Sequence, residues 1–355
     1  MKKAVALLVN DIHVEKPTIG DFLLNWDEVL EQCKANGLDT CFVGGDFFTS
    51  RSSQTLEVLM AVKDAIEKAE YKGINLYIAL GNHDMVDQDA LYGYPSLYDH
   101  HKNVTIINDK PFVFPIEGGK GLKLAVMRYW KENGVFEKKL DEFRSEINKR
   151  GESESDYILY VHEGIAGGLG DFEAPNELPK SIFSGFYKVL AAHYHFVRKI
   201  KNTGTHIEYI GSSRQKSHGE EGPQGYTLLW SDGSHSFIEN QVNTRYTTIE
   251  KDYEEILNDD FLKDITDYRD DDYRVRLIVN CTASQAKIID KQRLYDAGVT
   301  KLEVKSEEAV EEQTTDEDLS KKFDSAGVQA EYQIYCDKNN VDSELGMKYL
   351  FKLRK

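Results

Sequence analysis

The sequence has no long apolar run. No stretch approaches the roughly 20 apolar residues that a membrane-spanning helix needs. The apolar segment 4–9 follows two lysines and imitates a signal peptide, but it ends at Asn10-Asp11 and no small-residue cleavage site follows. We therefore expect a first β-strand in this segment, no membrane partner and a cytoplasmic location.

Cysteine is scarce and scattered. The chain has four cysteines, at positions 33, 41, 281 and 336, and no two of them have the CxxC spacing. This pattern suits a reducing compartment and argues against thiolate metal ligands. The sequence also contains no internal repeat and no low-complexity tract.

Positive charge is in deficit. The chain has 61 acidic and 44 basic residues, a net charge of −17, which argues against strong non-specific DNA binding by this chain alone. However, residues 250–324 hold 22 acids and 12 bases, so −10 of the total lies there. A phosphodiester substrate is not excluded, because bound dications or a basic partner can supply the missing charge.

The first 195 residues contain five short clusters of Asp, His and Asn, and each follows an apolar run with the pattern of a buried strand. The clusters are Asp11-Ile12-His13, Gly45-Asp46, Gly81-Asn82-His83-Asp84, His162 and His193-Tyr194-His195. An isolated Asp-x-His is common and carries little weight. Gly-Asn-His-Asp after a strand is far more specific, and five such clusters in order indicate one composite site.

Apolar periodicity predicts how these clusters meet. Strands are expected at 4–10, 40–44 and 74–80, with amphipathic helices at 21–36 and from 56 to near Gly73 between them. This alternation is typical of a parallel sheet layered with helices, whose sites lie at the carboxyl ends of the strands. The later expected elements are strands at 104–107, 122–127, 157–161 and 189–192, a helix at 137–149, and short antiparallel strands within 199–249.

We expect a domain boundary near residue 246. The predicted domains are 1–246, which carries the clusters; 247–310, a small α/β module; and 311–355, a linker and a terminal segment. Within the module, strands are expected at 273–279 and 300–305, with a helix at 286–297 between them. Residues 306–324 are highly charged and poor in apolar residues, which favours a linker, and 341–355 has the pattern of a docking helix.

The clusters have the chemistry of a site for two divalent metal ions. The expected ligands are Asp11, His13, Asp46, Asn82, His162, His193 and His195. Mixed imidazole and carboxylate ligands argue against Mg²⁺ or Ca²⁺ alone and favour manganese, iron or zinc. Two such ions about 3.5–4 Å apart support in-line attack on a phosphoester. Asp46 is the natural shared ligand because a carboxylate has two oxygens, and His83 could protonate the leaving oxygen.

Five other histidines and one glycine-rich segment are expected to have structural and not functional roles. We expect most of the five remaining histidines to be surface or hydrogen-bonded residues; they are His100, His101, His206, His218 and His235. The segment Gly164–Gly170 has four glycines but no lysine and no strand-to-helix context, so we expect a loop without a phosphate cradle.

In this order the five clusters resemble the calcineurin-like metallophosphoesterase superfamily. The resemblance implies an α+β fold, a four-layer α/β/β/α sandwich with a small α/β capping domain and a C-terminal helical tail. It implies one metal held by Asp11, His13, Asp46 and His195, and a second held by Asp46, Asn82, His162 and His193. His83 would be the catalytic acid.

A further segment, Tyr209–Tyr226, resembles the stretch that follows the last metal ligands in SbcD-type DNA repair nucleases, including phage-encoded versions. That resemblance implies an exonuclease and endonuclease subunit that uses two divalent ions, Mn²⁺ first and Fe²⁺, Zn²⁺ or Mg²⁺ as alternatives. The implied partners are DNA, a second copy of the chain, and an SMC-like coiled-coil ATPase bound through 330–355. The location would be the bacterial cytoplasm, or the host cytoplasm for a phage-encoded chain.

This sequence departs from the SbcD pattern at several positions. Ala191-Ala192 replaces the glycine often found before the last ligands, Ile210 replaces a proline, and Thr49 stands where His or Asp is common. Arg51 could compensate for Thr49, and Glu163 could orient His162. The candidate substrate contacts are Arg51, Thr49, Arg128 and Arg214.

Two other functions stay open at this point. A stand-alone phosphodiesterase or phosphatase would need only about the first 245 residues, and the additional module argues against it. A non-catalytic assembly protein is disfavoured by the complete ligand set.

Overall fold

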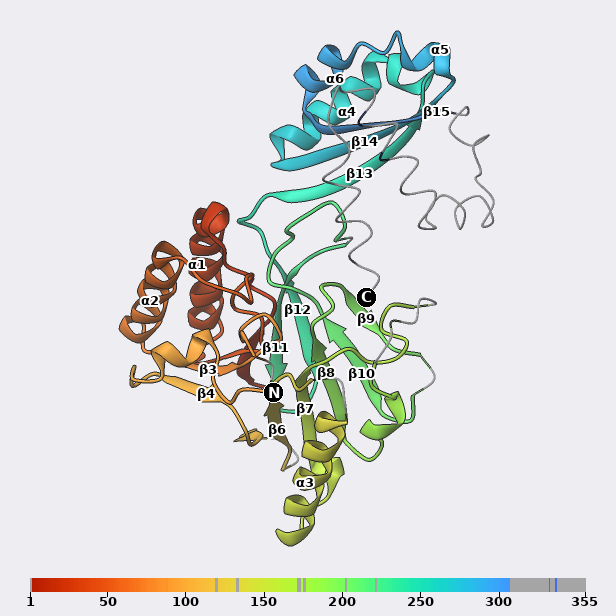
Figure 1. The fold of residues 1–355 in the computed structure, drawn as a ribbon. Helices are drawn as coiled ribbons and strands as arrows, with labels where there is room; N and C mark the ends of the chain where they lie inside the picture. The colour runs from red at the N-terminus through yellow and green to blue at the C-terminus, as the bar shows by residue number, and fades with distance from the viewer. Residues whose placement is uncertain are drawn as a thin grey trace. The chain divides into compact units, whose positions relative to one another are not determined.

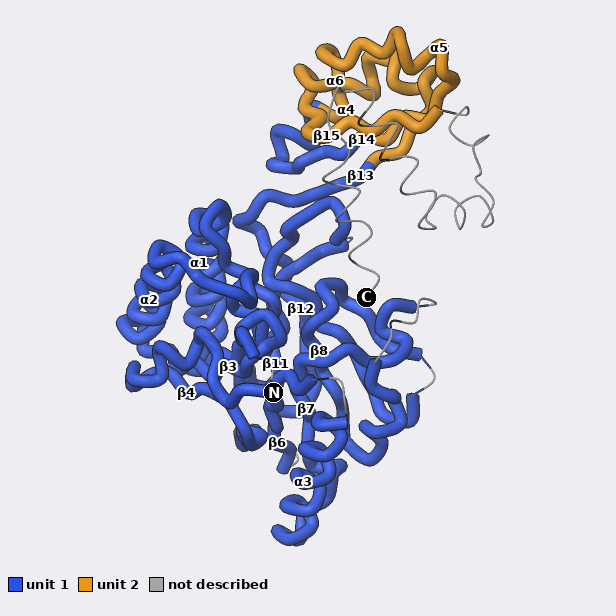
Figure 2. The backbone as a smooth tube through the Cα atoms, viewed as in Figure 1, with its two compact units in different colours: residues 1–248, 266–276 blue, residues 249–265, 277–355 orange. Residues whose placement is uncertain are grey.

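The computed structural model describes residues 2–306 with short gaps, together with residues 332 and 336. The gaps are residues 88, 119, 120, 132, 133, 171–173, 175, 176, 202 and 221. The expected linker at 306–324, the expected docking helix at 341–355 and the partner-binding tail at 330–355 therefore lie almost wholly outside the described residues. The chain forms two compact units, residues 1–248 with 266–276, and residues 249–265 with 277–355 (Figure 2).

The first sheet of the first unit has the strand order β12-β11-β1-β2-β3-β4. Its strands are β1 (Ala4–Val9), β2 (Thr40–Val43), β3 (Asn75–Ala79), β4 (Val104–Ile107), β11 (Gly225–Trp230) and β12 (His235–Glu239). The four strands β1 to β4 are parallel, and β11 pairs with β1 antiparallel. The carboxyl ends of β1, β2 and β3 therefore meet at one edge.

The second sheet has the order β5-β6-β7-β8-β10-β9. Its strands are β5 (Phe112–Pro115), β6 (Lys123–Met127), β7 (Tyr157–His162), β8 (Lys188–Ala192), β9 (Val197–Lys199) and β10 (His206–Ile210). Here β6, β7, β8 and β10 are parallel, so the strands that precede His162 and His193 also end together.

Alternation along the strands divides the core into layers. Leu7 and Val9 of β1 pack with the apolar faces of helices α1 (Ile19–Ala35) and α2 (Leu56–Tyr71). Ala6 and Leu8 face the other way, into a cluster that the two sheets share. Helix α3 (Val135–Lys149) covers the outer face of the second sheet (Figure 1). The expected four-layer α/β/β/α sandwich is thus confirmed.

The remaining three-stranded sheet has the order β13-β14-β15. It consists of β13 (Arg245–Asp252), β14 (Tyr273–Cys281) and β15 (Val299–Ser306), with helices α4 (Asp259–Asp270), α5 (Ala283–Ala286) and α6 (Lys291–Ala297). Short 3₁₀ turns span Lys16–Thr18, Tyr94–Tyr98, Glu154–Asp156, Lys180–Phe183 and Glu255–Leu257. In the described part of the chain no helix has the length and apolar character of a membrane span.

Two local predictions were wrong, and one helix was missed. The stretch 199–249 is not wholly antiparallel, because β10 pairs parallel with β8. The helix expected at 286–297 is two helices, because α5 ends at Ala286 and Asp290 caps α6 through a bond from the Arg293 amide at 3.0 Å. Helix α4 was not expected, because only Phe261 and Ile265 of its twelve residues are buried.

Candidate metal centre

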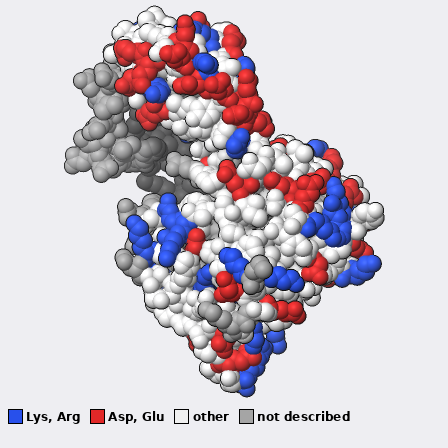
Figure 3. All heavy atoms as spheres, turned by 180° about the vertical axis from the view of Figure 1, so that it is seen from behind, with Lys and Arg blue, Asp and Glu red and all other residues white. Residues whose placement is uncertain are grey.

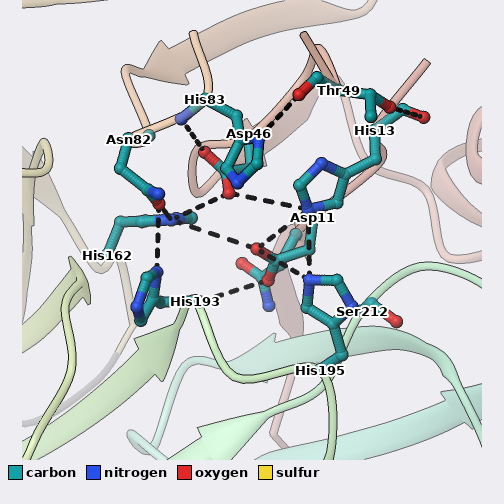
Figure 4. Close-up of polar contacts among 12 residues, drawn as sticks. Asp11, His13, Asp46, Thr49, Asn82, His83, His162, His193, His195 and Ser212 are labelled. Atoms are coloured by element: carbon teal, nitrogen blue, oxygen red, sulfur yellow. Dashed lines mark hydrogen bonds and ion pairs between the residues drawn. The ribbon is translucent and has the colours of Figure 1, made fainter. Parts of the chain in front are cut away.

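Five strands deliver the seven expected ligand residues to one place. Asp11 and His13 follow β1, Asp46 follows β2 and Asn82 follows β3 in the first sheet. In the second sheet His162 ends β7, while His193 and His195 follow β8. Figure 4 shows all seven side chains directed toward a common centre between the two sets of strand ends.

Asp11, His13 and His195 form the first of two groups. The Nε2 atoms of His13 and His195 are 3.1 Å apart, and Asp11 Oδ1 lies 4.0 Å and 3.8 Å from them. Asp11 is fully buried, yet its Oδ1 has no hydrogen-bond partner among the described residues. A buried carboxylate oxygen without a partner is costly, so this atom is a natural cation ligand.

Asp46, Asn82, His162 and His193 form the second group. Asp46 Oδ2 lies 3.4 Å from His162 Nε2, and the Asn82 side chain lies 3.1 Å from that nitrogen and 3.0 Å from His193 Nδ1. The Asn82 amide can adopt two orientations. With its oxygen inward it adds a neutral ligand to the group, and with its oxygen outward it accepts a hydrogen bond from Arg51 Nη2.

Asp46 stands at the junction of the two groups. Its Oδ2 is 3.5 Å from His13 Nε2 and 3.4 Å from His162 Nε2, one nitrogen in each group. Its Oδ1 accepts a hydrogen bond of 2.7 Å from the His83 amide, which fixes the carboxylate plane. This is the geometry that a shared ligand requires.

The backbone at the centre is strained. Asp11, His13, Asp46 and His193 all have positive φ, at 48°, 50°, 52° and 94°. Residues other than glycine rarely adopt this region, at a cost of about 1–3 kcal/mol each. Four such residues in one site show that the surrounding sheets hold these ligands in place against local preference.

Two glycines let the strand ends approach each other. Gly45 has φ +103°, and a Cβ there would lie 2.4 Å from His162 Nδ1. A Cβ at Gly81 would lie 2.2 Å from both the amide nitrogen and Oδ1 of Asp46. The role of Gly45 is therefore to admit the His162 ring.

Burial and mutual charge set the protonation of the ligands. Burial lowers the pKa of His13 well below its usual value and, together with the charge of His162, lowers the pKa of His193 to about 3. Burial also acts on His162, but Asp46 and Asp11 outweigh it and raise the pKa of His162 to about 10. The imidazoles of His13 and His193 are therefore neutral near pH 7, the form that binds metal.

The donor set fits two divalent cations. Each group combines imidazole nitrogens with a carboxylate, their ligand atoms lie within 4.8 Å of one another, and Asp46 contacts both groups. The unpartnered Asp11 Oδ1 is the atom that a cation would satisfy.

His83 and Thr49 lie beside these groups. The His83 ring packs edge-on against His13, with ring centroids 5.0 Å apart, and its Nδ1 lies 2.6 Å from the Thr49 carbonyl oxygen. Since that carbonyl can only accept, Nδ1 carries a proton and Nε2 is the nitrogen left for chemistry. The Thr49 hydroxyl donates to the His13 carbonyl at 2.7 Å, so it holds the loop, and its contact with substrate stays a prediction.

Several groups orient the ligands. The Gly44 carbonyl accepts from His162 Nδ1 at 2.8 Å, so the expected role of Glu163 was wrong; Glu163 accepts from the Trp130 amide instead. Glu220 bonds His195 Nδ1 at 2.6 Å. Glu220 has no role among the sequence-based predictions, and its one signal in the sequence is its place in the turn after Tyr209.

Asp84 was also left without a role. It is fully buried and accepts from the amides of Phe48 at 3.0 Å and Gly81 at 2.8 Å, which ties the two ligand loops together. Burial and the charge of Asp46 raise the pKa of Asp84 to about 7.

The structure brings one of the three candidate arginines to the centre. Arg51 is exposed, and its guanidinium reaches the Asn82 amide. Arg128 is fully buried, lies 3.7 Å over the Trp130 ring and donates to the Ala90 carbonyl. Arg214 is 3% exposed and donates to Thr18 Oγ1 at 3.3 Å. Neither buried arginine is placed to contact a substrate.

A third group of possible ligands lies away from the centre, on β10 and β12. Glu208 accepts from His206 Nε2 at 2.7 Å and lies 3.2 Å from His235 Nε2. Lys188 Nζ lies 3.1 Å from His235 Nδ1 and supplies the positive charge at this position. His206 and His235 are thus hydrogen-bonded residues.

With this geometry established, we compared the chain with known proteins. The model of the calcineurin-like phosphoesterase family matches residues 5–197, more than half of the chain, and this span contains all seven ligand residues. The chain belongs to this family. Its members are phosphoester hydrolases that use divalent metals, and the two groups around Asp46 fit a dimetal site of that kind.

The other comparisons are less informative. The search of curated proteins found no match. Among the 86 matching chains of solved structures, one described only as "Crystal structure of" is 9% identical to this chain. The superposition covers 67% of this chain and 99% of the other, with a TM-score of 0.39.

Proposed function

We propose that this phosphoesterase is the nuclease subunit of an SbcCD-type recombination and repair complex, a Mn²⁺-dependent exonuclease and endonuclease. The observation that supports phosphodiester hydrolysis most directly is the position of Asp46 between two carboxylate–imidazole groups. Support for DNA as the substrate comes from the turn after Tyr209 and from the additional unit beyond the matched residues.

In this proposal the residues have distinct tasks. Asp11, His13, Asp46 and His195 hold one cation, and Asp46, Asn82, His162 and His193 hold the other. When bound, such ions neutralise the phosphate and acidify a water. Arg51, beside Asn82, is placed to contact a phosphate oxygen.

His83 is the proposed general acid. The Thr49 carbonyl keeps a proton on Nδ1, so a proton on Nε2 makes the ring an imidazolium that can release it to the leaving oxygen. The amide of His83 also donates to Asp46 Oδ1, which fixes the position of His83 relative to the shared ligand.

The partners are part of the same proposal. Residues 247–310 would form an accessory DNA-binding domain, 330–355 would bind an SMC-like coiled-coil ATPase, and the chain would act as a dimer. The ATPase would supply the positive surface that this acidic chain lacks, and a second copy of the chain would supply a second active site.

The test is hydrolysis of end-labelled linear DNA and of bis(p-nitrophenyl) phosphate by the full chain with Mn²⁺ or Mg²⁺, with and without the ATPase. We expect DNA degradation with Mn²⁺, abolished in His83→Ala while two metals still bind. Full DNA cleavage by His83→Ala would contradict the acid assignment. Hydrolysis of the small ester without any DNA cleavage would favour a stand-alone phosphodiesterase.

A further inference from the structure

The β9 edge of the second sheet carries a basic pocket. A cavity of about 580 Å³ lies between the loop that contains Gly167 and Gly170 and the residues around β9. Its lining includes four cationic side chains, Lys180, Arg198, Lys199 and Lys201. Figure 3 shows basic side chains gathered at this edge, on the left of that view.

None of these four cations forms an ion pair with another described residue. Arg198 Nη1 instead donates to the Gly168 carbonyl at 3.2 Å, and Lys180 Nζ donates to the Lys201 carbonyl at 3.2 Å. Some lysines elsewhere in the chain, such as Lys63 with Glu67, do pair with nearby acids. Four cations that line one cavity and form no ion pair with a described residue, in a chain of charge −17, form a local site for an anion.

The glycine loop shapes this pocket. Gly170 has φ +77°, and a Cβ there would lie 3.0 Å from Arg198 Nη1, so a side chain would push the guanidinium aside. The lysines that the sequence of this loop lacks are supplied by Lys180 and by β9 and the residues after it. This is why the sequence alone gave no sign of an anion site here.

A row of aromatic rings connects the pocket to the metal centre. The Tyr194 ring lies 5.1 Å from the ring of His193, and the Phe196 ring lies 5.8 Å further on, tilted 29° from Tyr194. The Arg198 guanidinium covers Phe196 at 4.5 Å. Tyr194 and Phe196 are half-buried, so each retains exposed surface next to a metal ligand.

We propose that Tyr194, Phe196 and the four cations form a track for the single-stranded part of a nucleic-acid substrate. A base next to the scissile phosphate lies against the rings, and a phosphate further along the strand enters the pocket. This inference rests on the proposed nuclease function. A strand is favoured over an acidic peptide because only a strand pairs a π face with each negative charge. An unpaired strand is required because a base within a duplex hides both faces.

The test compares the double variant R198Q/K201Q with the control K110Q/K149Q. The control removes two exposed charges elsewhere on the same unit that likewise form no ion pair with a described residue. Substrates are a 15-nucleotide oligothymidylate and bis(p-nitrophenyl) phosphate, with Mn²⁺ and the full chain. For R198Q/K201Q we expect the ratio of the two kcat/KM values, oligonucleotide over small ester, to fall about tenfold. The slope of log K against log salt for oligonucleotide binding should fall by about 1.4.

The rings are tested separately. Phe196→Leu keeps apolar contact with the core but removes the π face, and should weaken oligonucleotide binding at least about fivefold, while Phe196→Tyr should restore it. Quenching of a 2-aminopurine base near the cleavage site reports the stacking directly. We expect quenching to be lost in Phe196→Leu and retained in wild type and in Phe196→Tyr.

The outcomes separate this inference from the proposed function. If wild type cleaves the oligonucleotide and R198Q/K201Q behaves like K110Q/K149Q, the track is wrong and the nuclease stands. If wild type hydrolyses only the small ester, both are overturned. If polyglutamate of equal charge competes as well as the oligonucleotide, the pocket takes any polyanion and the nucleic-acid assignment fails.

Discussion

Replacing Gly45 with alanine tests whether glycine is what allows His162 to reach the metal centre. Two costs follow from the structure. Alanine at φ +103° costs about 1–2 kcal/mol in backbone strain. The new Cβ would lie 2.4 Å from His162 Nδ1, so the ring must move and lose its bond to the Gly44 carbonyl, which costs about 1–3 kcal/mol for a buried group.

The matched control is Gly37→Ala. Gly37 also has positive φ, +67°, but a Cβ there meets nothing within 4 Å, so only the strain applies. In urea unfolding with chelator present, we expect Gly45→Ala to lower the free energy of unfolding by about 2–5 kcal/mol and Gly37→Ala by about 1–2 kcal/mol.

Metal content separates stability from the site. By calorimetric titration and elemental analysis, Gly37→Ala should bind two Mn²⁺ ions as wild type does. Gly45→Ala should lose about 10–100-fold in affinity for the ion held by His162 and His193. If Gly45→Ala binds both ions with wild-type affinity, or costs no more stability than Gly37→Ala, the packing argument around His162 is wrong.

Two further predictions concern Glu220 and Glu208. Glu220→Gln leaves a neutral partner on His195 Nδ1, so Mn²⁺ affinity at the first group should fall about 10–100-fold while DNA binding in chelator is unaffected; an unchanged titration would contradict this orienting role. His235 and His206 outweigh burial and lower the pKa of Glu208 from 4.5 to about 2, so its stabilising contribution is present above pH 4.5 and is lost as pH falls toward 2. In Glu208→Gln, the loss of unfolding free energy between pH 4.5 and pH 2 should therefore be smaller than in wild type, by at most about 3 kcal/mol. The same pH dependence of unfolding in variant and wild type would refute this prediction.

Much of the sandwich could be predicted because its strands are short apolar runs that end at polar residues or glycines. Thr40–Val43 is buried throughout, and Val104–Ile107 is buried at both ends and lies between two asparagines, which makes the limits of these strands readable from the sequence. The direction of β10 could not be predicted, because its neighbour β8 is chosen by non-local packing. Helix α4 was missed because its sequence, rich in aspartate, offers little apolar periodicity.

At the site, the ligand residues could be identified because their side-chain chemistry is explicit in the sequence. The burial of two of the candidate arginines could not be predicted. Arg128 and Arg214 are buried by tertiary contacts with Trp130 and Thr18, which no local pattern predicts. Glu220 lies 25 residues from His195 and joins it only in the folded chain.

The strained backbone at the metal centre follows from the fact that its ligands come from two packed sheets. Asp11, His13 and Asp46 come from the first sheet and His193 from the second, and all four have positive φ. Such conformations persist only where the surroundings over-determine them, which here are the largely buried strands β1, β2 and β8. Cations held jointly by both sets of strand ends would tie the two sheets together at this edge. Metal affinity and packing between the sheets are therefore linked, so a substitution that loosens the shared core, far from any ligand, should also weaken metal binding.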